Sequence, residues 1–180
     1  NLAIAAFKAG DIDLAFNMVD QVFKAGRHNE HLLVSVMTVA MEAGQPQLGL
    51  YFYELNEKKF SARVDFIAGE LARYMKQPER CVELCELTLA QEPGYGAAYI
   101  IMAQSLSELG RFTESQSTAD KFLTEVDLDA LAIEKMPNPW ASYALFDDPS
   151  LQLKLANRYA DHIYNRLPRE MVHVGGRKGN

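Results

Sequence analysis

Cysteine is scarce in this sequence. Only two occur among the 180 residues, Cys81 and Cys85, and residues four apart on a helix lie on the same face. This spacing suits packing inside a helical protein and excludes the disulfide framework of small secreted domains. We therefore expect a protein of a reducing compartment and predict a cytoplasmic location.

Long hydrophobic runs are also absent. No apolar stretch approaches the roughly 18 residues of a membrane span, although hydrophobic residues make up 48% of the chain, which is ordinary for a soluble globular protein. The chain begins NLAIAAFKAG, without the basic segment and cleavage site of a targeting peptide. We expect an excised piece of a longer chain and predict no membrane partner.

Positive charge is in deficit. Lys and Arg number 18 against 24 Asp and Glu, which gives a net charge of -6, whereas a general nucleic-acid binder presents a basic stripe. We therefore predict no nucleic-acid partner. The charge is unevenly spread, because basic residues outnumber acidic ones from Leu151 onward.

Motifs that carry catalysis or bind cofactors are missing. The sequence has no phosphate-binding GxxxxGK[ST], no dinucleotide-binding GxGxxG, no HExxH and no GxSxG. His28 and His31 lie one helical turn apart, but no third metal ligand accompanies them, so a polar loop edge explains them better. Asp147 and Asp148 precede Pro149, which is typical of a helix N-cap rather than of paired catalytic carboxylates. We predict no catalytic residue, no cofactor and no metal site.

What the sequence does contain is a repeat. The segments GDIDLA, GQPQLG, KQPERC and GRFTES start at Gly10, Gly44, Lys76 and Gly110, and these starts are 34, 32 and 34 residues apart. Each segment has a turn residue, then an apolar or Pro residue, then a small residue: Ala15, Gly49, Cys81 or Ser115. This order fits a helical hairpin, because Gly ends the first helix, Pro opens the second, and the small residue allows a close approach.

The pattern resembles the tetratricopeptide repeat over residues 1–126. AGELARY and MAQSLSEL supply first helices, with Gly69 and Ala103 at their small positions. The tryptophan of the family motif is replaced by Leu33, Asp65 and Tyr99, so the repeats are degenerate. The resemblance implies an all-α, tetratricopeptide-like helical-hairpin solenoid with about three and a half units. Because a repeat cannot bury its inner face alone, we expect earlier repeats, or a second copy of the chain, to cover the incomplete first unit.

In such a solenoid the first helices line the concave face. The middle unit is richest there in planar cations and aromatic rings, the residue types favoured at interface hot spots. We predict a groove that binds a protein or peptide and is formed by Arg63, Phe66, Glu70, Arg73, Tyr74 and Gln104. The alternative is that these are solvated helix residues, with Phe66 packing neighbouring repeats together.

The segment after the repeats does not follow the period. We expect a short helix over 127–136, a break at Pro137 and Pro139, and an amphipathic helix that begins at Pro149 and ends near Arg166. This last helix is predicted to cap the array, with Trp140, Tyr143, Leu145 and Phe146 as anchors of the connector. The expected divisions are 1–126 for the repeats, 127–168 for the connector and capping helix, and 169–180 for a polar linker.

The connector PWASYALFDDPSLQLKLANRYADHIY resembles the segment that follows the tetratricopeptide repeats of SPINDLY-like, or O-linked N-acetylglucosamine transferase-like, proteins. The match is carried by Pro139, Asp147, Asp148, Pro149, Gln152, Leu153, Ala156, Tyr159 and Ala160. The resemblance implies a parent enzyme that transfers a sugar from a nucleotide-sugar donor to protein hydroxyls, with its catalytic half after Asn180. The asparagine ladder of the animal members is replaced by Asn1, Ser35, Ile67 and Ile101, so an acceptor would be held differently.

Two classes of function therefore stay open. The first is a protein-interaction module that forms the repeat region of a larger protein O-glycosyltransferase-like enzyme. The second is a non-enzymatic scaffold or chaperone adaptor whose C-terminal helix only caps the array. Homodimerisation through the uncapped first unit is a further alternative.

Overall fold

The computed structural model describes residues 2–25, 30–55, 60–142 and 145–166, and within these ranges every regular element is a helix. In chain order the elements are α1 (Leu2–Lys8), α2 (Ile12–Lys24), α3 (Glu30–Glu42), α4 (Pro46–Glu54), α5 (Ala62–Tyr74), α6 (Pro78–Gln91), α7 (Gly96–Glu108), α8 (Phe112–Glu125), the 3-10 helix η1 (Ile133–Lys135), α9 (Pro139–Ser142) and α10 (Pro149–Arg166). The predicted all-α fold class is confirmed.

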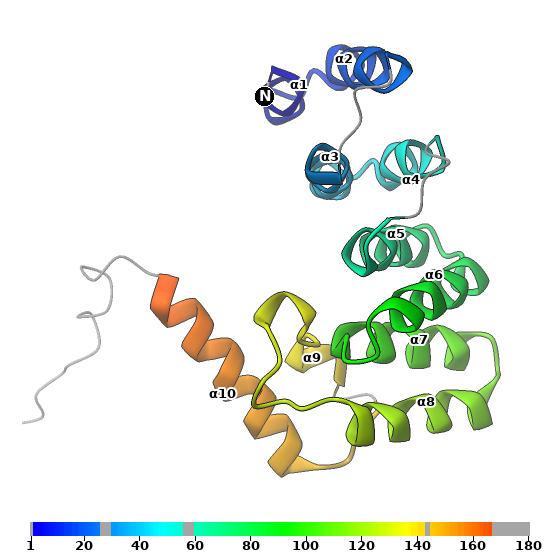
Figure 1. Ribbon diagram of the computed structural model, residues 1–180, viewed down its shortest axis with the longest axis vertical. Coiled ribbons are helices and arrows are strands. Elements are labelled where there is room, and N and C mark those ends of the chain that lie inside the picture. The colour runs from blue at the N-terminus through cyan, green and yellow to red at the C-terminus, as the bar shows by residue number, and fades with distance from the viewer. Residues whose placement is uncertain (1, 26–29, 56–59, 143–144, 167–180) are drawn as a thin grey trace, which may run out of the picture.

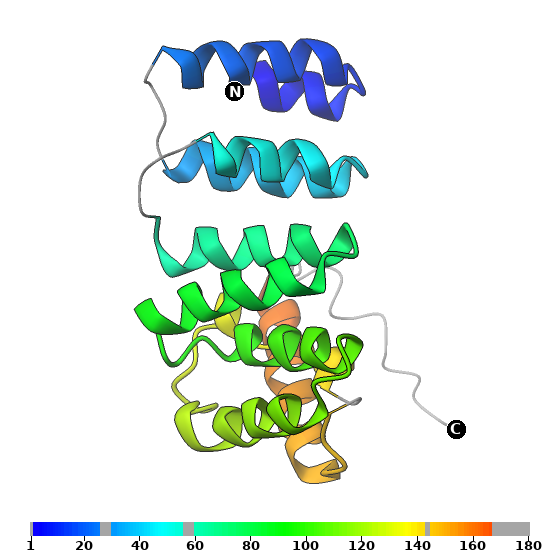
Figure 2. The same cartoon turned by 90° about the vertical axis from the view of Figure 1, so that its right-hand side faces the viewer.

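Successive helices pair into hairpins, and the hairpins stack on one another. The pairs are α1 with α2, α3 with α4, α5 with α6, and α7 with α8 (Figure 1, Figure 2). Helix α1 also contacts α3, α3 contacts α5, and α5 contacts α7, so the first helices of the hairpins form a continuous layer. This is the hairpin solenoid that the repeat predicts.

The four hairpin turns share one backbone geometry. The turn residue has a positive φ in each: 81° at Gly10, 70° at Gly44, 59° at Lys76 and 74° at Gly110. The next N–H then donates to a carbonyl five residues earlier, as from Gln45 to Ala40 at 2.8 Å. A left-handed residue at the end of a helix favours Gly, because a Cβ there costs roughly 1–2 kcal/mol. The aligned turn residues of the sequence therefore mark the hairpin turns, and Lys76 adopts this conformation without being Gly.

Small residues lie where neighbouring helices approach closely. Ala15, Gly49, Cys81 and Ser115 are all buried. A Cβ added at Gly49 would lie 2.8 Å from a methyl group of Leu71 and 3.3 Å from the Cα of Met37. Ser115 uses its hydroxyl group across its hairpin, where Oγ donates to the carbonyl of Ala103 at 2.7 Å. The predicted role of these positions in helix packing is confirmed.

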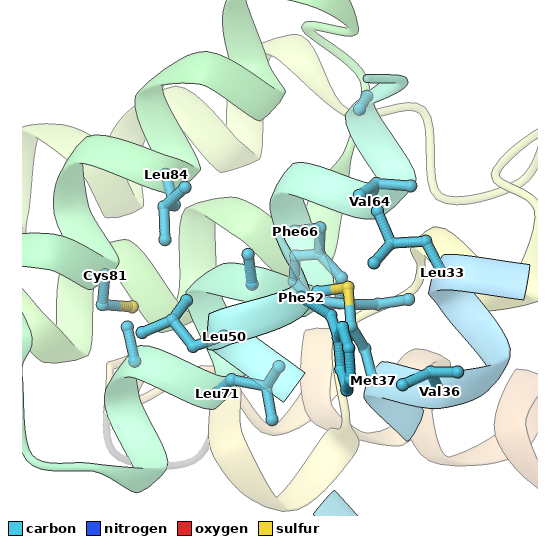
Figure 3. Packing of buried hydrophobic residues seen from close by; sticks show 14 of the residues in the cluster. Leu33, Val36, Met37, Leu50, Phe52, Val64, Phe66, Leu71, Cys81 and Leu84 are labelled. Carbon is cyan, nitrogen blue, oxygen red and sulfur yellow. The ribbon is translucent and has the colours of Figure 1, made fainter. Parts of the chain in front are cut away.

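The main hydrophobic core lies between the helices of the stack. Figure 3 shows labelled side chains of α3, α4, α5 and α6 gathered there, among them Leu33, Phe52 and Leu71. Beside this core, the carboxylate of Asp65 accepts hydrogen bonds from Tyr53 Oη at 2.8 Å and Gln91 Nε2 at 2.6 Å. Burial raises the pKa of Asp65. A polar network around the buried Asp65 thus links α4, α5 and α6 where the repeat family has tryptophan.

The connector packs on the last hairpin through a second hydrophobic cluster. Phe146 and the fully buried Leu155 join Tyr99 and Phe122 of α7 and α8 in this cluster. Helix α10 starts at Pro149, as predicted, and Asp148 caps it, since Oδ1 accepts from the next two free backbone N–H groups at 2.9 and 3.1 Å. The helix therefore caps the array, as the sequence predicts.

Two details of the connector prediction are wrong. The stretch 127–136 contains a turn over 128–130 and only η1 is helical, because Asp127 Oδ1 accepts the backbone N–H groups of Asp129 and Ala130 and stabilises the turn instead. Trp140 is 78% exposed and does not anchor the connector, because α9 is a single turn that buries Pro139 and Ser142 on its other side. Tyr143 and the predicted linker 169–180 lie outside the described residues.

Candidate partner-binding groove

Two adjoining pockets lie along the first-helix side of the middle repeats, and we call them together the α5–α7 groove. The first has a volume of about 430 Å³ and is lined by Glu70, Arg73, Tyr74, Lys76, Ile101 and Glu108. The second has a volume of about 410 Å³ and is lined by Phe66, Glu70, Arg73, Ala97, Ile100, Ile101, Ile133, Glu134, Met136, Pro137, Asn138, Ala141 and Tyr159. Glu70, Arg73 and Ile101 line both pockets, so they mark the centre of the groove.

Helix α5 supplies most of the predicted groove residues. Phe66, Glu70, Arg73 and Tyr74 follow the spacing of one helix face, with steps of four and three residues. Their exposure differs. Tyr74 is 68% exposed, whereas Phe66 is 7% exposed and stacks on the ring of Tyr95 with 4.7 Å between the ring centroids. Phe66 therefore packs neighbouring repeats together, as the alternative reading expected, and also forms part of the pocket wall.

Arg73 lies between two carboxylates. Its Nη2 lies 3.6 Å from Oε1 of Glu108 on α7, and both side chains are partly exposed. The Nε of Arg73 is buried and has no hydrogen-bond partner among the described residues. The guanidinium is thus held at the groove wall by a long ion pair, with its Nε enclosed by the protein.

Glu70 is an acid of the groove whose pKa is strongly shifted. Burial raises its pKa from 4.5 to about 7, although the neighbouring positive charge of Arg73 acts in the opposite direction. No described residue donates a hydrogen bond to its carboxylate. A partly buried carboxylate without a donor is unfavourable in its charged form, so near neutral pH Glu70 is divided between its two protonation states.

The connector forms the second wall of the groove. The predicted groove residue Gln104 serves this wall, because its Nε2 donates to the carbonyl of Ala141 at 2.7 Å. Arg158 of α10 donates to the carbonyl of Leu131 at 2.9 Å, and Lys135 pairs with Glu92. Gln104 thus holds α9 in place instead of presenting its amide nitrogen to a partner.

Some groove residues are not found by sequence reasoning. The wall that includes Met136, Pro137, Asn138 and Tyr159 comes from the connector, which has no repeat register to place it. The apolar residues of the connector indicated only that this segment is buried against the last hairpin, and not that it lines the groove. Arg63, which the register placed in the groove, is exposed and lines neither pocket.

The other candidate sites do not assemble in the described part of the chain. No three potential metal ligands come together there, His31 is exposed, and His28 lies outside it. Cys81 and Cys85 are fully buried, and the hydrogen bond between them together with burial raises the pKa of the Cys85 thiol. None of the described helices has the length and apolar character needed to cross a membrane.

Comparisons with known proteins agree with the fold. No protein-family model and no curated protein matches the sequence. Two crystal structures of MamA align over 92% of this chain and over 98% and 92% of theirs, with TM-scores of 0.60 and 0.59 and 16% identity. The structure of a MamA mutant aligns over 70% of this chain and 93% of its own, with a TM-score of 0.51 and 18% identity. At this identity the likeness concerns the fold, which is a tetratricopeptide-like helical repeat.

Proposed function

We propose that this chain is a protein-interaction module that binds a segment of another protein in the α5–α7 groove. The observation that carries the proposal is the position of Arg73 and Tyr74, a cation and an exposed aromatic ring beside the apolar surface of Ile101. Arg and Tyr are enriched among residues that dominate binding energy, and helical solenoids present extended concave surfaces to their partners.

A pull-down with a matched control tests this function. The Arg73→Ala/Tyr74→Ala variant changes the groove, whereas Lys121→Ala/Phe112→Ala changes exposed residues on α8, which line neither pocket. We expect the groove variant to lose partners that the wild type and the control retain. Identical sets of partners for all three proteins would refute the proposal.

The sequence of the connector supports a more specific proposal, that this module belongs to a protein O-glycosyltransferase-like enzyme and presents acceptor proteins to it. Its support is the resemblance over Pro139 to Ala160, in which Asp148 and Pro149 form the start of α10. Reading the coding sequence beyond Asn180 tests it. A nucleotide-sugar-binding half is the expected result, and a stop codon or an unrelated domain would leave the scaffold or chaperone-adaptor function.

Self-association is a separate proposal for the first unit. Leu2 of α1 is 73% exposed and Leu14 of α2 is 48% exposed, so this end of the array presents apolar side chains. A second copy that covered them would bury apolar surface that the monomer leaves in water. Light scattering at high concentration should then detect dimers, which Leu2→Asp/Leu14→Asp should dissociate. Monomers alone would refute this proposal.

A further inference from the structure

The centre of the α5–α7 groove contains an acid that nothing in the described chain satisfies. Glu70 lines both pockets, is partly buried, and accepts no hydrogen bond from a described residue. Its nearest opposite charge is Arg73, which already forms an ion pair with Glu108. A carboxylate in this situation is stabilised when a cationic donor enters the pocket and replaces the lost water.

The other charges around the groove favour the same kind of ligand. The acidic groups that face it are Glu70, Glu108 of α7 and Glu134 of η1, against Arg73 and Lys76. An incoming carboxylate would meet Glu70 and Glu108 on either side of Arg73, and like charges repel at such distances. The whole chain carries a net charge of -6, which also attracts basic segments.

The surfaces beside Glu70 suit the rest of a lysine or arginine side chain. Ile101 is apolar and 8% exposed, so the methylene groups of a long basic side chain would pack on it. Tyr74 lies one helical turn from Glu70 and presents an exposed ring that attracts cations. Arg73 lines both pockets and its side chain is 37% exposed, so its guanidinium offers donors to a backbone carbonyl of the same ligand segment.

We propose that the α5–α7 groove selects a protein segment that places a lysine or arginine side chain against Glu70. The proposal rests on the proposed function of the groove and adds the chemistry of its partner. Because only the ionised carboxylate pairs with the incoming cation, binding is linked to the loss of a proton from Glu70.

This proton linkage predicts the direction and the size of the change in affinity with pH. In the empty groove, burial raises the pKa of Glu70 to about 7, and a bound cation lowers it. Affinity should therefore fall as the pH decreases, and the dissociation constant should be about tenfold higher at pH 6 than at pH 8. Besides the charged groups of the groove named above, Cys85 and Tyr95 also interact with Glu70. Burial raises the pKa of Tyr95, and the hydrogen bond to Cys81 together with burial raises that of the Cys85 thiol, so neither group gives rise to the pH effect that we expect from Glu70.

A peptide selection provides the probes. The immobilised chain is exposed at pH 8 to a random library of dodecapeptides, and peptides are kept if they bind the wild type and not Arg73→Ala/Tyr74→Ala. Their synthetic copies are measured by fluorescence anisotropy with each lysine left in place, replaced by norleucine, or replaced by glutamate. The receptors are the wild type, Glu70→Gln, and Glu86→Gln as a control at an exposed site on α6.

The expected result is enrichment of lysine or arginine and a loss of roughly tenfold in affinity when one such residue is replaced by norleucine. This loss and the pH dependence should disappear in Glu70→Gln and persist in Glu86→Gln. Peptides that need Arg73 and Tyr74 but lack a basic residue, or that bind Glu70→Gln unchanged, would refute the inference and leave the groove function intact. If no selected peptide depends on Arg73 and Tyr74, the proposed function itself is wrong.

Discussion

Replacing Glu70 by glutamine should stabilise the protein at neutral and alkaline pH. Burial raises the pKa of Glu70 from 4.5 to about 7 in the folded chain, so folding favours the protonated acid. The stability that this group contributes is complete below pH 4.5 and is lost as the pH rises through 7. Glutamine has nearly the same shape and never ionises, so Glu70→Gln avoids the loss.

The size of the effect follows from the pKa difference. One pKa unit corresponds to about 1.4 kcal/mol, which gives roughly 3 kcal/mol for the full difference. Because Glu70 is only partly buried, solvent reduces this value, and we expect about 2 kcal/mol at pH 8. For a chain of this length, that corresponds to a rise in Tm of roughly 4–8 °C.

The assay is thermal unfolding followed by circular dichroism at pH 4.5, 6, 7 and 8 for the wild type, Glu70→Gln and Glu86→Gln. The difference between the wild type and Glu70→Gln should be near zero at pH 4.5 and grow up to pH 8. Other groups with a raised pKa, such as Asp65, affect the stability of both proteins equally, so their contributions cancel in the difference between wild type and variant. A constant difference at every pH, or a destabilised Glu70→Gln, would refute the reasoning about burial.

Three further predictions concern the fold. Lys76→Gly should raise the free energy of unfolding by about 1 kcal/mol, because the residue has a φ of 59°; chemical denaturation measures this, and a loss of stability would contradict it. Gly49→Ala should destabilise the chain by about 1–3 kcal/mol, because its Cβ would lie 2.8 Å from a methyl group of Leu71. Gly69→Ala should stabilise the chain by about 0.5–1 kcal/mol, because its Cβ would have ordinary contacts of 3.6 Å. Changes in unfolding free energy of the same sign for both variants would contradict this account of the packing. Leu155→Ala should lower the free energy of unfolding by about 2–5 kcal/mol, because Leu155 is fully buried. Leu153 is 62% exposed, so Leu153→Ala should lower it by less than about 0.5 kcal/mol. Equal losses of stability would show that α10 is not docked.

The repeat could be predicted from the sequence because its signals are local. A left-handed turn residue and a following proline act within a few residues of chain, so Gly44 with Pro46 and Lys76 with Pro78 identify hairpin turns without any knowledge of distant contacts. The same register placed Glu70, Arg73 and Tyr74 on one face of α5. The periodicity of a helix is sufficient for that step.

The connector wall could not be predicted in the same way. The connector occurs once, so no period relates its residues to those of α7, and its path depends on tertiary contacts such as the one between Gln104 and Ala141. Aromatic content alone also misled the prediction at Trp140, since a single-turn helix buries one side only. Charge and hydrophobicity indicated that the segment must dock, and the structure was needed to show where.

Because the connector forms one wall of the α5–α7 groove, its docking and partner binding must be coupled. A partner that touches both Glu70 on α5 and Tyr159 on α10 binds only while α10 is docked, so binding stabilises docking and docking strengthens binding by the same free energy. The apparent affinity is then reduced in proportion to the fraction of molecules with a docked connector. Leu155→Ala should therefore weaken groove ligands as it undocks α10, although Leu155 is fully buried and touches no ligand, whereas Leu153→Ala should leave their affinity unchanged. If Leu155→Ala undocks α10 and keeps full affinity, ligands bind to the repeats alone.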